Sequence, residues 1–128
     1  MVEEILKFTK IVFVIQAIVG FAFGLVFLLA GELFMILEGW PYYAPVFIRL
    51  TGMDFIGMAV LILLSSREKE WAKVKNVVIM VVFWTILNSI VFTILHYVHN
   101  LPPINWTNIG SYMLFAVLYI IVYIKQRK

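Results

Sequence analysis

Residues 76–124 form a run of 49 residues that contains no Asp, Glu, Lys or Arg. A helix that crosses the hydrocarbon core of a bilayer needs about 20 predominantly apolar residues. The run is therefore too long for one crossing. It is interrupted at Pro102 and Pro103, because consecutive prolines end a helix and the neighbouring asparagines favour a turn. It predicts two membrane-spanning helices, at about 76–98 and 107–124.

The first half of the chain predicts two more spans. Residues 11–31 carry no charge, and residues 46–66 are apolar except for Arg49 and Asp54. The whole chain is 64% hydrophobic and 13% charged, whereas soluble proteins average about half apolar and about a quarter charged residues. A soluble domain of 128 residues cannot bury that excess. We predict an all-α, four-helix transmembrane bundle, with residues 1–128 as a single domain in a lipid bilayer.

The distribution of basic residues predicts the orientation of this bundle. Nine of the ten Lys and Arg residues lie in the N-terminal tail, in the loop after the second span or at the C-terminus, and only Arg49 lies on the other side. Loops rich in Lys and Arg stay in the cytoplasm. We expect a multi-pass protein of the cell membrane with both termini cytoplasmic.

Composition and motifs argue against several classes of protein. The chain has no cysteine, so disulfides and thiolate chemistry are excluded. The net charge of +3 belongs to no soluble basic module, which argues against nucleic acid binding. His96 and His99 lack further ligands of the types that metal or haem sites need, so we expect no metal and no cofactor. Common enzyme signatures are absent, which favours a non-enzymatic protein.

The third predicted span carries a polar stripe. At 100° per residue, its polar side chains fall within an arc of about 100° that cannot face lipid cheaply. The stripe contains Thr85, Asn88, Ser89, His96 and His99. It either packs inside the bundle or lines a wet cavity that opens outward.

Asp54 lies at the depth of Asn88, because each is ~18 Å from the cytoplasmic end of its span at ~1.5 Å per residue. An ionisable group inside a span is a candidate functional group. Its candidate partners are Arg49 and Asn88. The pair is either a structural ion pair or network, or part of a site for a small ligand, an ion or a proton. The candidate ligand-binding residues are Asp54, Asn88, Ser89, Thr85, His96 and Arg49.

Two other spans carry residues suited to helix packing. Gly20 and Gly24 have the small-residue spacing that allows two membrane helices to approach closely, which favours a seam within the bundle over a homodimer face. Gln16 lies on the same side and is expected to bond to a neighbouring helix. Tyr119, deep in the fourth span, should find a hydrogen-bond partner in the core. In the alternative, the tyrosine face of that span forms a wall for a flat apolar ligand such as a quinone or lipid.

Residues 49–57 carry the pattern Arg-x-x-Gly-x-x-x-x-Gly, made by Arg49, Gly52 and Gly57. The pattern follows a first span and a proline-containing outer loop, and precedes an apolar run that ends in cytoplasmic charges. This half of the chain resembles DoxX-like small four-helix membrane proteins. The resemblance implies the same fold, in a group that is mostly uncharacterised or accessory to redox complexes.

These features lead to one functional hypothesis and two rivals. We expect a non-enzymatic bundle that binds a partner membrane protein, or a small amphipathic ligand in an outward-facing polar cavity between spans two and three. The first rival is a small transporter or channel that self-associates through Gly20 and Gly24 and uses Asp54 as an ion or proton carrier. The second is an enzyme acting on lipid, but Asp54 and His96 would lie ~12 Å apart along the membrane normal, too far to act together.

Overall fold

A computed structural model describes residues 3–40 and 45–127. Four helices make up most of it: α1 (Lys7–Glu38), α2 (Pro45–Arg67), α3 (Trp71–His99) and α4 (Asn105–Arg127). All four are long and apolar enough to cross a membrane. The predicted all-α architecture with four apolar helices is therefore confirmed. The helices are longer than the predicted spans because the flanking residues, several of them charged, are helical as well.

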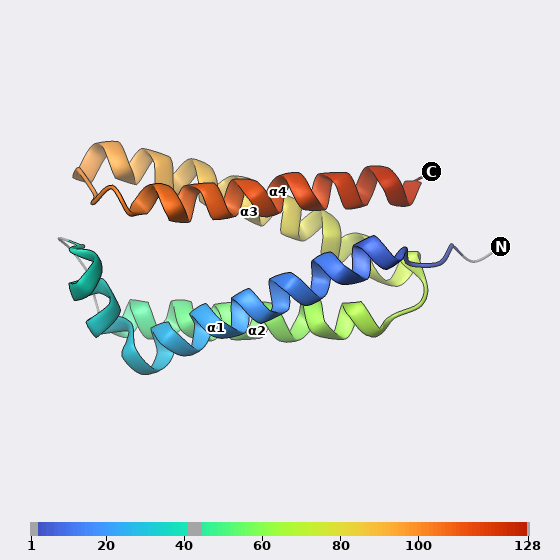
Figure 1. Ribbon diagram of the computed structural model, residues 1–128, viewed down its shortest axis with the longest axis horizontal. Coiled ribbons are helices and arrows are strands. Elements are labelled where there is room, and N and C mark those ends of the chain that lie inside the picture. Colours follow the sequence, from blue (N-terminus) through green and yellow to red (C-terminus); the bar gives the residue numbers. More distant parts are fainter. Residues whose placement is uncertain (1–2, 41–44, 128) are drawn as a thin grey trace.

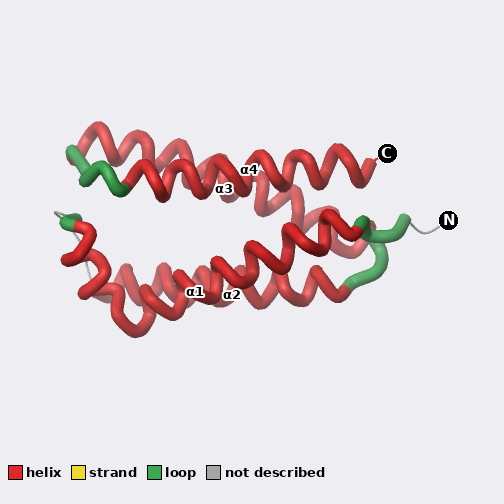
Figure 2. Tube along the Cα trace, viewed as in Figure 1, coloured by secondary structure: helices red, strands yellow, loops and turns green. Residues whose placement is uncertain are grey.

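The four helices form two hairpins, α1 with α2 and α3 with α4 (Figure 1). The hairpins meet at the end of the molecule that carries both termini, and they diverge toward the other end (Figure 2). We call these the joined end and the divergent end. The molecule is thus two helical pairs in contact over only part of their length.

Small residues set the close packing of α1 on α2. A Cβ atom on Gly24 would lie 2.6 Å from Cγ1 of Ile56, and one on Gly20 would lie 3.1 Å from Cβ of Ala59. On the facing helix, a Cβ atom on Gly52 would lie 2.7 Å from the main-chain nitrogen of Leu28. The structure places Gly20 and Gly24 in a seam within the bundle, where α2 covers them.

At the joined end, all four helices contribute to one apolar core. Phe13 of α1, Ile62 of α2, Val78 of α3 and Tyr119 of α4 are each fully buried. The Phe13 and Tyr119 rings lie 5.9 Å apart between their centroids. Burial of apolar side chains from every helix fixes the two hairpins to each other here.

Gln126, near the end of α4, ties the chain termini together at the joined end. Its Oε1 accepts hydrogen bonds from the Leu6 N–H at 3.1 Å and from Thr9 Oγ1 at 3.2 Å. Its Nε2 donates to the Glu4 carbonyl oxygen at 2.7 Å. The N-terminal segment also pairs with the α2–α3 connection through two main-chain hydrogen bonds, from Ile5 to Lys69 and from Trp71 to Glu3. Gln126 is only 2% exposed, so its three hydrogen bonds, which we call the Gln126 clamp, are buried.

α1 bends before it reaches its end. Ala30 has non-helical dihedral angles (φ −138°, ψ 27°), and the next residue, Gly31, lies directly against Ile48 of α2. Beyond this kink, the last turns of α1 leave the α1–α2 pair and rise across the divergent end toward the other hairpin (Figure 1). Trp40 follows them, and its ring lies 6.5 Å from that of Phe92 on α3. The kinked segment therefore spans the gap between the hairpins.

Candidate functional site

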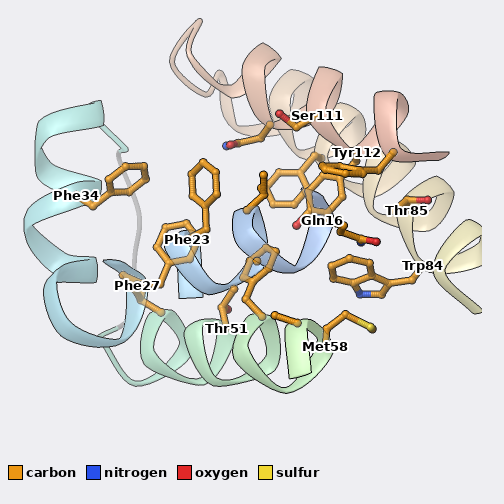
Figure 3. A pocket seen from close by; sticks show the side chains of 18 of the residues that line it. Gln16, Phe23, Phe27, Phe34, Thr51, Met58, Trp84, Thr85, Ser111 and Tyr112 are labelled. Atoms are coloured by element: carbon orange, nitrogen blue, oxygen red, sulfur yellow. The ribbon is translucent and has the colours of Figure 1, made fainter. Parts of the chain in front are cut away.

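A cavity of about 470 Å³ lies between the two hairpins (Figure 3). All four helices and Trp40 contribute to its wall. Most of the lining side chains are aromatic or aliphatic, and they include Val19, Phe23, Phe27, Phe34, Met35, Phe47, Ile48, Phe55, Met58, Ala59, Ile62, Trp84, Phe92, Leu95, Tyr112 and Phe115. The cavity is therefore an apolar space enclosed by membrane-type helices.

The aromatic side chains of this wall touch one another in an unbroken series that passes through every helix. Neighbouring ring centroids are 5.5–6.5 Å apart, a separation at which aromatic pairs attract. In order, the series is Phe27 of α1, Phe55 of α2, Trp84 of α3, Tyr112 of α4, Phe92 of α3 and Trp40 after α1. We call this series the aromatic wall. It joins the hairpins where their backbones have diverged.

A few polar side chains also line the cavity, namely Gln16, Glu38, Thr51, Thr85, Asn108 and Ser111. Gln16 lines the cavity on the part of α1 nearer the joined end, is 6% exposed, and its Oε1 has no hydrogen-bond partner among the described residues. Thr85 of α3 is 1% exposed and donates to the Val81 carbonyl of its own helix at 2.8 Å. At the divergent end, Trp40 Nε1 donates to Glu38 Oε2 at 2.9 Å. Among the described lining residues, Glu38 alone carries a charge.

Three of the residues predicted from sequence line this cavity, namely Thr85, Gln16 and Gly20. The hydrogen bond expected between Gln16 and a neighbouring helix is not made by its oxygen, which is buried and has no hydrogen-bond partner among the described residues. The partner expected for Tyr119 is also absent from the described residues, although the side chain is fully buried.

Two further residues of the polar stripe, Asn88 and Ser89, donate hydrogen bonds to carbonyls of their own helix. Asn88 Nδ2 donates to the Trp84 carbonyl at 2.8 Å, and Ser89 Oγ donates to the Thr85 carbonyl at 2.9 Å. Such bonds to the preceding turn are open to any short polar side chain in a helix. Asn88 and Ser89 are not among the residues that line the cavity. The described cavity is thus mainly apolar and lies between the two hairpins, and among the described residues Thr85 is the one from the stripe that lines it.

His96 lies at the α3–α4 connection rather than in the cavity. Its Nδ1 is 3.4 Å from Nδ2 of Asn105, and its ring centroid is 4.7 Å from that of Trp106. It therefore packs against the start of α4. In residues 3–40 and 45–127, no three His, Asp or Glu side chains gather in a way that could hold a metal ion.

Arg49 and Asp54 do not form the pair considered from the sequence. Arg49 bonds to Glu32 of α1 at 3.3 Å, and both side chains are well exposed. Asp54 is five positions after Arg49, a separation that turns α2 by about 140° and directs the two side chains to different sides of the helix. Asp54 is exposed, lies outside the cavity lining, and bonds to no described residue.

Sequence reasoning predicted one part of the aromatic wall as an alternative, the tyrosine face of α4, and missed the rest of the wall and the Gln126 clamp. A phenylalanine that faces lipid and one that faces a cavity have the same periodicity, so pattern alone does not separate them. Gln126 lies between Lys125 and Arg127, and a polar residue in such a charged segment is expected to be exposed to solvent. The one feature that could have indicated the Gln126 clamp is that Gln126 is an uncharged amide between two charged residues.

No protein-family model, curated protein or solved structure matched this chain. The fold and the cavity define it as a four-helix chain with the properties of a multi-pass membrane protein.

Proposed function

We propose that this chain is a multi-pass membrane protein, with both termini in the cytoplasm, that binds a small lipophilic molecule bearing a hydroxyl group. The orientation is supported by the joined end, which carries the start of α1, the α2–α3 connection and the end of α4, and with them eight of the nine basic residues that the structure describes. The binding function is supported by the cavity between the hairpins.

One observation carries the proposal: an aromatic cavity of about 470 Å³ is lined by Gln16, whose buried amide oxygen has no hydrogen-bond partner among the described residues. Binding sites for small molecules are typically apolar cavities of about 300–1,000 Å³ with a few placed polar groups. A buried acceptor left without a hydrogen bond costs about 1–3 kcal/mol. A bound hydroxyl group would remove that cost at Gln16.

The lining also restricts the rest of the ligand. Gln16 and Thr85 are neutral, and the one charged lining residue, Glu38, lies at the divergent end and is bonded by Trp40. The ligand body is therefore apolar and uncharged, with rings or branched chains that pack on the aromatic wall. Its hydroxyl group points toward the joined end, and its body extends toward the kinked segment of α1.

Access for such a ligand is from the bilayer. The helix backbones of the two hairpins approach each other only sparsely, between α2 and α3 and between α1 and α4, and beyond the joined end the connection is made by side chains of the aromatic wall. A lipophilic molecule can pass between the helices there without crossing the Gln126 clamp.

A pair of pyrene-labelled probes tests this function. The purified full-length protein, in phosphatidylcholine vesicles, is titrated with a pyrene-labelled long-chain alcohol and with its methyl ether, and binding is followed by energy transfer from tryptophan. Trp40 and Trp84 line the cavity and serve as donors. We expect the alcohol to bind more tightly than the ether by roughly two- to tenfold, the value of one hydrogen bond.

Two variants complete the test. Gln16→Leu should abolish the preference for the alcohol, because it removes the free acceptor. Asn88→Leu is the matched control, since it removes the same amide from a residue outside the lining, and it should keep the preference. Equal binding of alcohol and ether to the wild-type protein, or a preference that survives Gln16→Leu, would refute the proposal.

A further inference from the structure

Asp54 stands in the middle of α2 on the outer surface of the molecule. It is nine residues from Pro45 and thirteen from Arg67, which places it ~14 Å and ~20 Å from the two ends of the helix. In the proposed membrane arrangement, this depth is close to the centre of the hydrocarbon core. The side chain is exposed and bonds to no described residue. A carboxylate that faces acyl chains at this depth is unfavourable unless another group covers it.

The surface around Asp54 is shaped for another helix. Gly57, one turn farther along, is exposed, and a Cβ atom built on it meets no described atom within 4 Å. Exposed apolar side chains flank the two residues on the side away from the cavity, within an arc of about 80°. They are Leu50, Leu61 and Leu64. We call Asp54, Gly57 and these leucines the Asp54 face.

A polar residue beside a small residue on an apolar helix surface is typical of contacts between membrane helices. Small residues let two helix backbones approach, and polar groups bond across the contact. Gly24 and Gly52 allow such a close approach between α1 and α2. Gly57 leaves a similar space for a helix backbone, which we call the notch at Gly57. No described atom fills this notch, and it lies beside the Asp54 carboxylate.

A second copy of this chain cannot supply the charge that Asp54 lacks. Arg49 is the only Lys or Arg within the four apolar windows 11–31, 46–66, 76–98 and 107–124, and Glu32 already binds it. A symmetric contact through α2 would instead bring Asp54 against its own copy. The complementary group must come from a different protein.

We propose that the Asp54 face binds a transmembrane helix of another protein, and that this helix carries a Lys or Arg at mid-membrane depth. The cation pairs with the Asp54 carboxylate, while the backbone of the partner helix lies in the notch at Gly57. This inference does not rest on the cavity or its ligand, because Asp54 and Gly57 lie outside the cavity lining.

Synthetic helices test the inference. The chain has no cysteine, so Arg67→Cys, at the exposed end of α2, gives a single site for a fluorescent donor. The labelled full-length protein is reconstituted in phosphatidylcholine vesicles with acceptor-labelled 21-residue leucine-rich peptides that carry a central Lys, Leu or Glu. Energy transfer is measured as a function of the peptide-to-lipid ratio.

We expect the Lys peptide to associate roughly three- to thirtyfold more strongly than the Leu peptide, as for one polar contact between membrane helices. Asp54→Asn should remove most of this difference, and Gly57→Leu should weaken association of the Lys peptide by blocking the notch. Gly110→Leu is the matched control, because Gly110 of α4 is also exposed with open space around it. It should change nothing.

Three results would overturn the inference. The first is equal association of the Lys and Leu peptides with the wild-type protein. The second is a Lys preference that persists in Asp54→Asn. The third is energy transfer between copies of the protein itself that Asp54→Asn abolishes and the Lys peptide does not displace, because that result would assign the face to a second copy.

Discussion

The close packing of α1 on α2 can be tested by changing Gly52 and Gly57 to alanine in two separate variants. The two glycines lie five residues apart in α2. A Cβ atom on Gly52 would lie 2.7 Å from the Leu28 nitrogen and 2.8 Å from the Gly24 oxygen, whereas one on Gly57 meets no described atom within 4 Å. Each change to alanine gains about 1 kcal/mol of helix propensity. That gain cancels when the two variants are compared.

The difference between Gly52→Ala and Gly57→Ala is therefore the cost of overpacking alone. Inserting a methyl group into a filled interface typically costs about 1–3 kcal/mol. The obstacles at Gly52 are main-chain atoms of the facing helix, which cannot rotate away, so α1 and α2 must move apart. We expect Gly52→Ala to be less stable than Gly57→Ala by about 2–3 kcal/mol, at the upper end of that range. Gly57→Ala should equal or exceed the wild type.

Reversible unfolding in mixed micelles measures this difference. The purified full-length variants, in dodecylmaltoside, are titrated with sodium dodecyl sulfate, and the loss of tertiary structure is followed by tryptophan fluorescence and near-ultraviolet circular dichroism. The order of the midpoints gives the order of stability. If Gly52→Ala unfolds at the same midpoint as Gly57→Ala or later, the two helices are not in backbone contact at Gly52 and the described seam is wrong.

The same titration tests two buried polar groups whose surroundings differ. Gln126→Leu breaks three hydrogen bonds at the joined end and leaves Thr9 buried without its acceptor, so we expect it to lower the free energy of unfolding by about 2–3 kcal/mol; a loss below the error of the titration would contradict the clamp. Tyr119→Phe removes a buried hydroxyl that bonds to no described residue, so we expect a variant at least as stable as the wild type. A clear loss of stability in Tyr119→Phe would reveal a partner for that hydroxyl, such as bound water.

The helices could be predicted because their causes are local. A charge-free length and a pair of prolines act within one stretch of chain, and the structure ends α3 at His99 and starts α4 at Asn105, around Pro102 and Pro103. The glycine spacing on α1 was likewise sufficient to indicate a contact surface, although it did not identify α2 as the helix that covers it.

The site was harder to predict because polar side chains in a helix have two ways to bond. The stripe on α3 indicated a wet cavity, but Asn88 and Ser89 donate to carbonyls of their own helix and need no partner elsewhere. The depth of Asp54 suggested Asn88 as its partner, but depth does not specify azimuth, and Asn88 donates to its own helix. Arg49, the other candidate, bonds to Glu32. Apart from the tyrosine face of α4, the aromatic wall had no signature in the sequence, because lipid and cavity are both apolar surroundings.

The position of α2 explains how one short helix can present two separate surfaces. Its glycine seam holds it tightly to α1, while it touches α3 only sparsely, so most of its circumference is left free. One free flank, with Phe55 and Met58, faces the cavity, and Asp54 begins the flank that faces outward. Met58 and Asp54 differ by only about 40° around the helix axis. A ligand in the cavity and a helix on the Asp54 face would therefore contact neighbouring turns of α2, yet Gln16→Leu and Asp54→Asn each remove a group that only one of them uses.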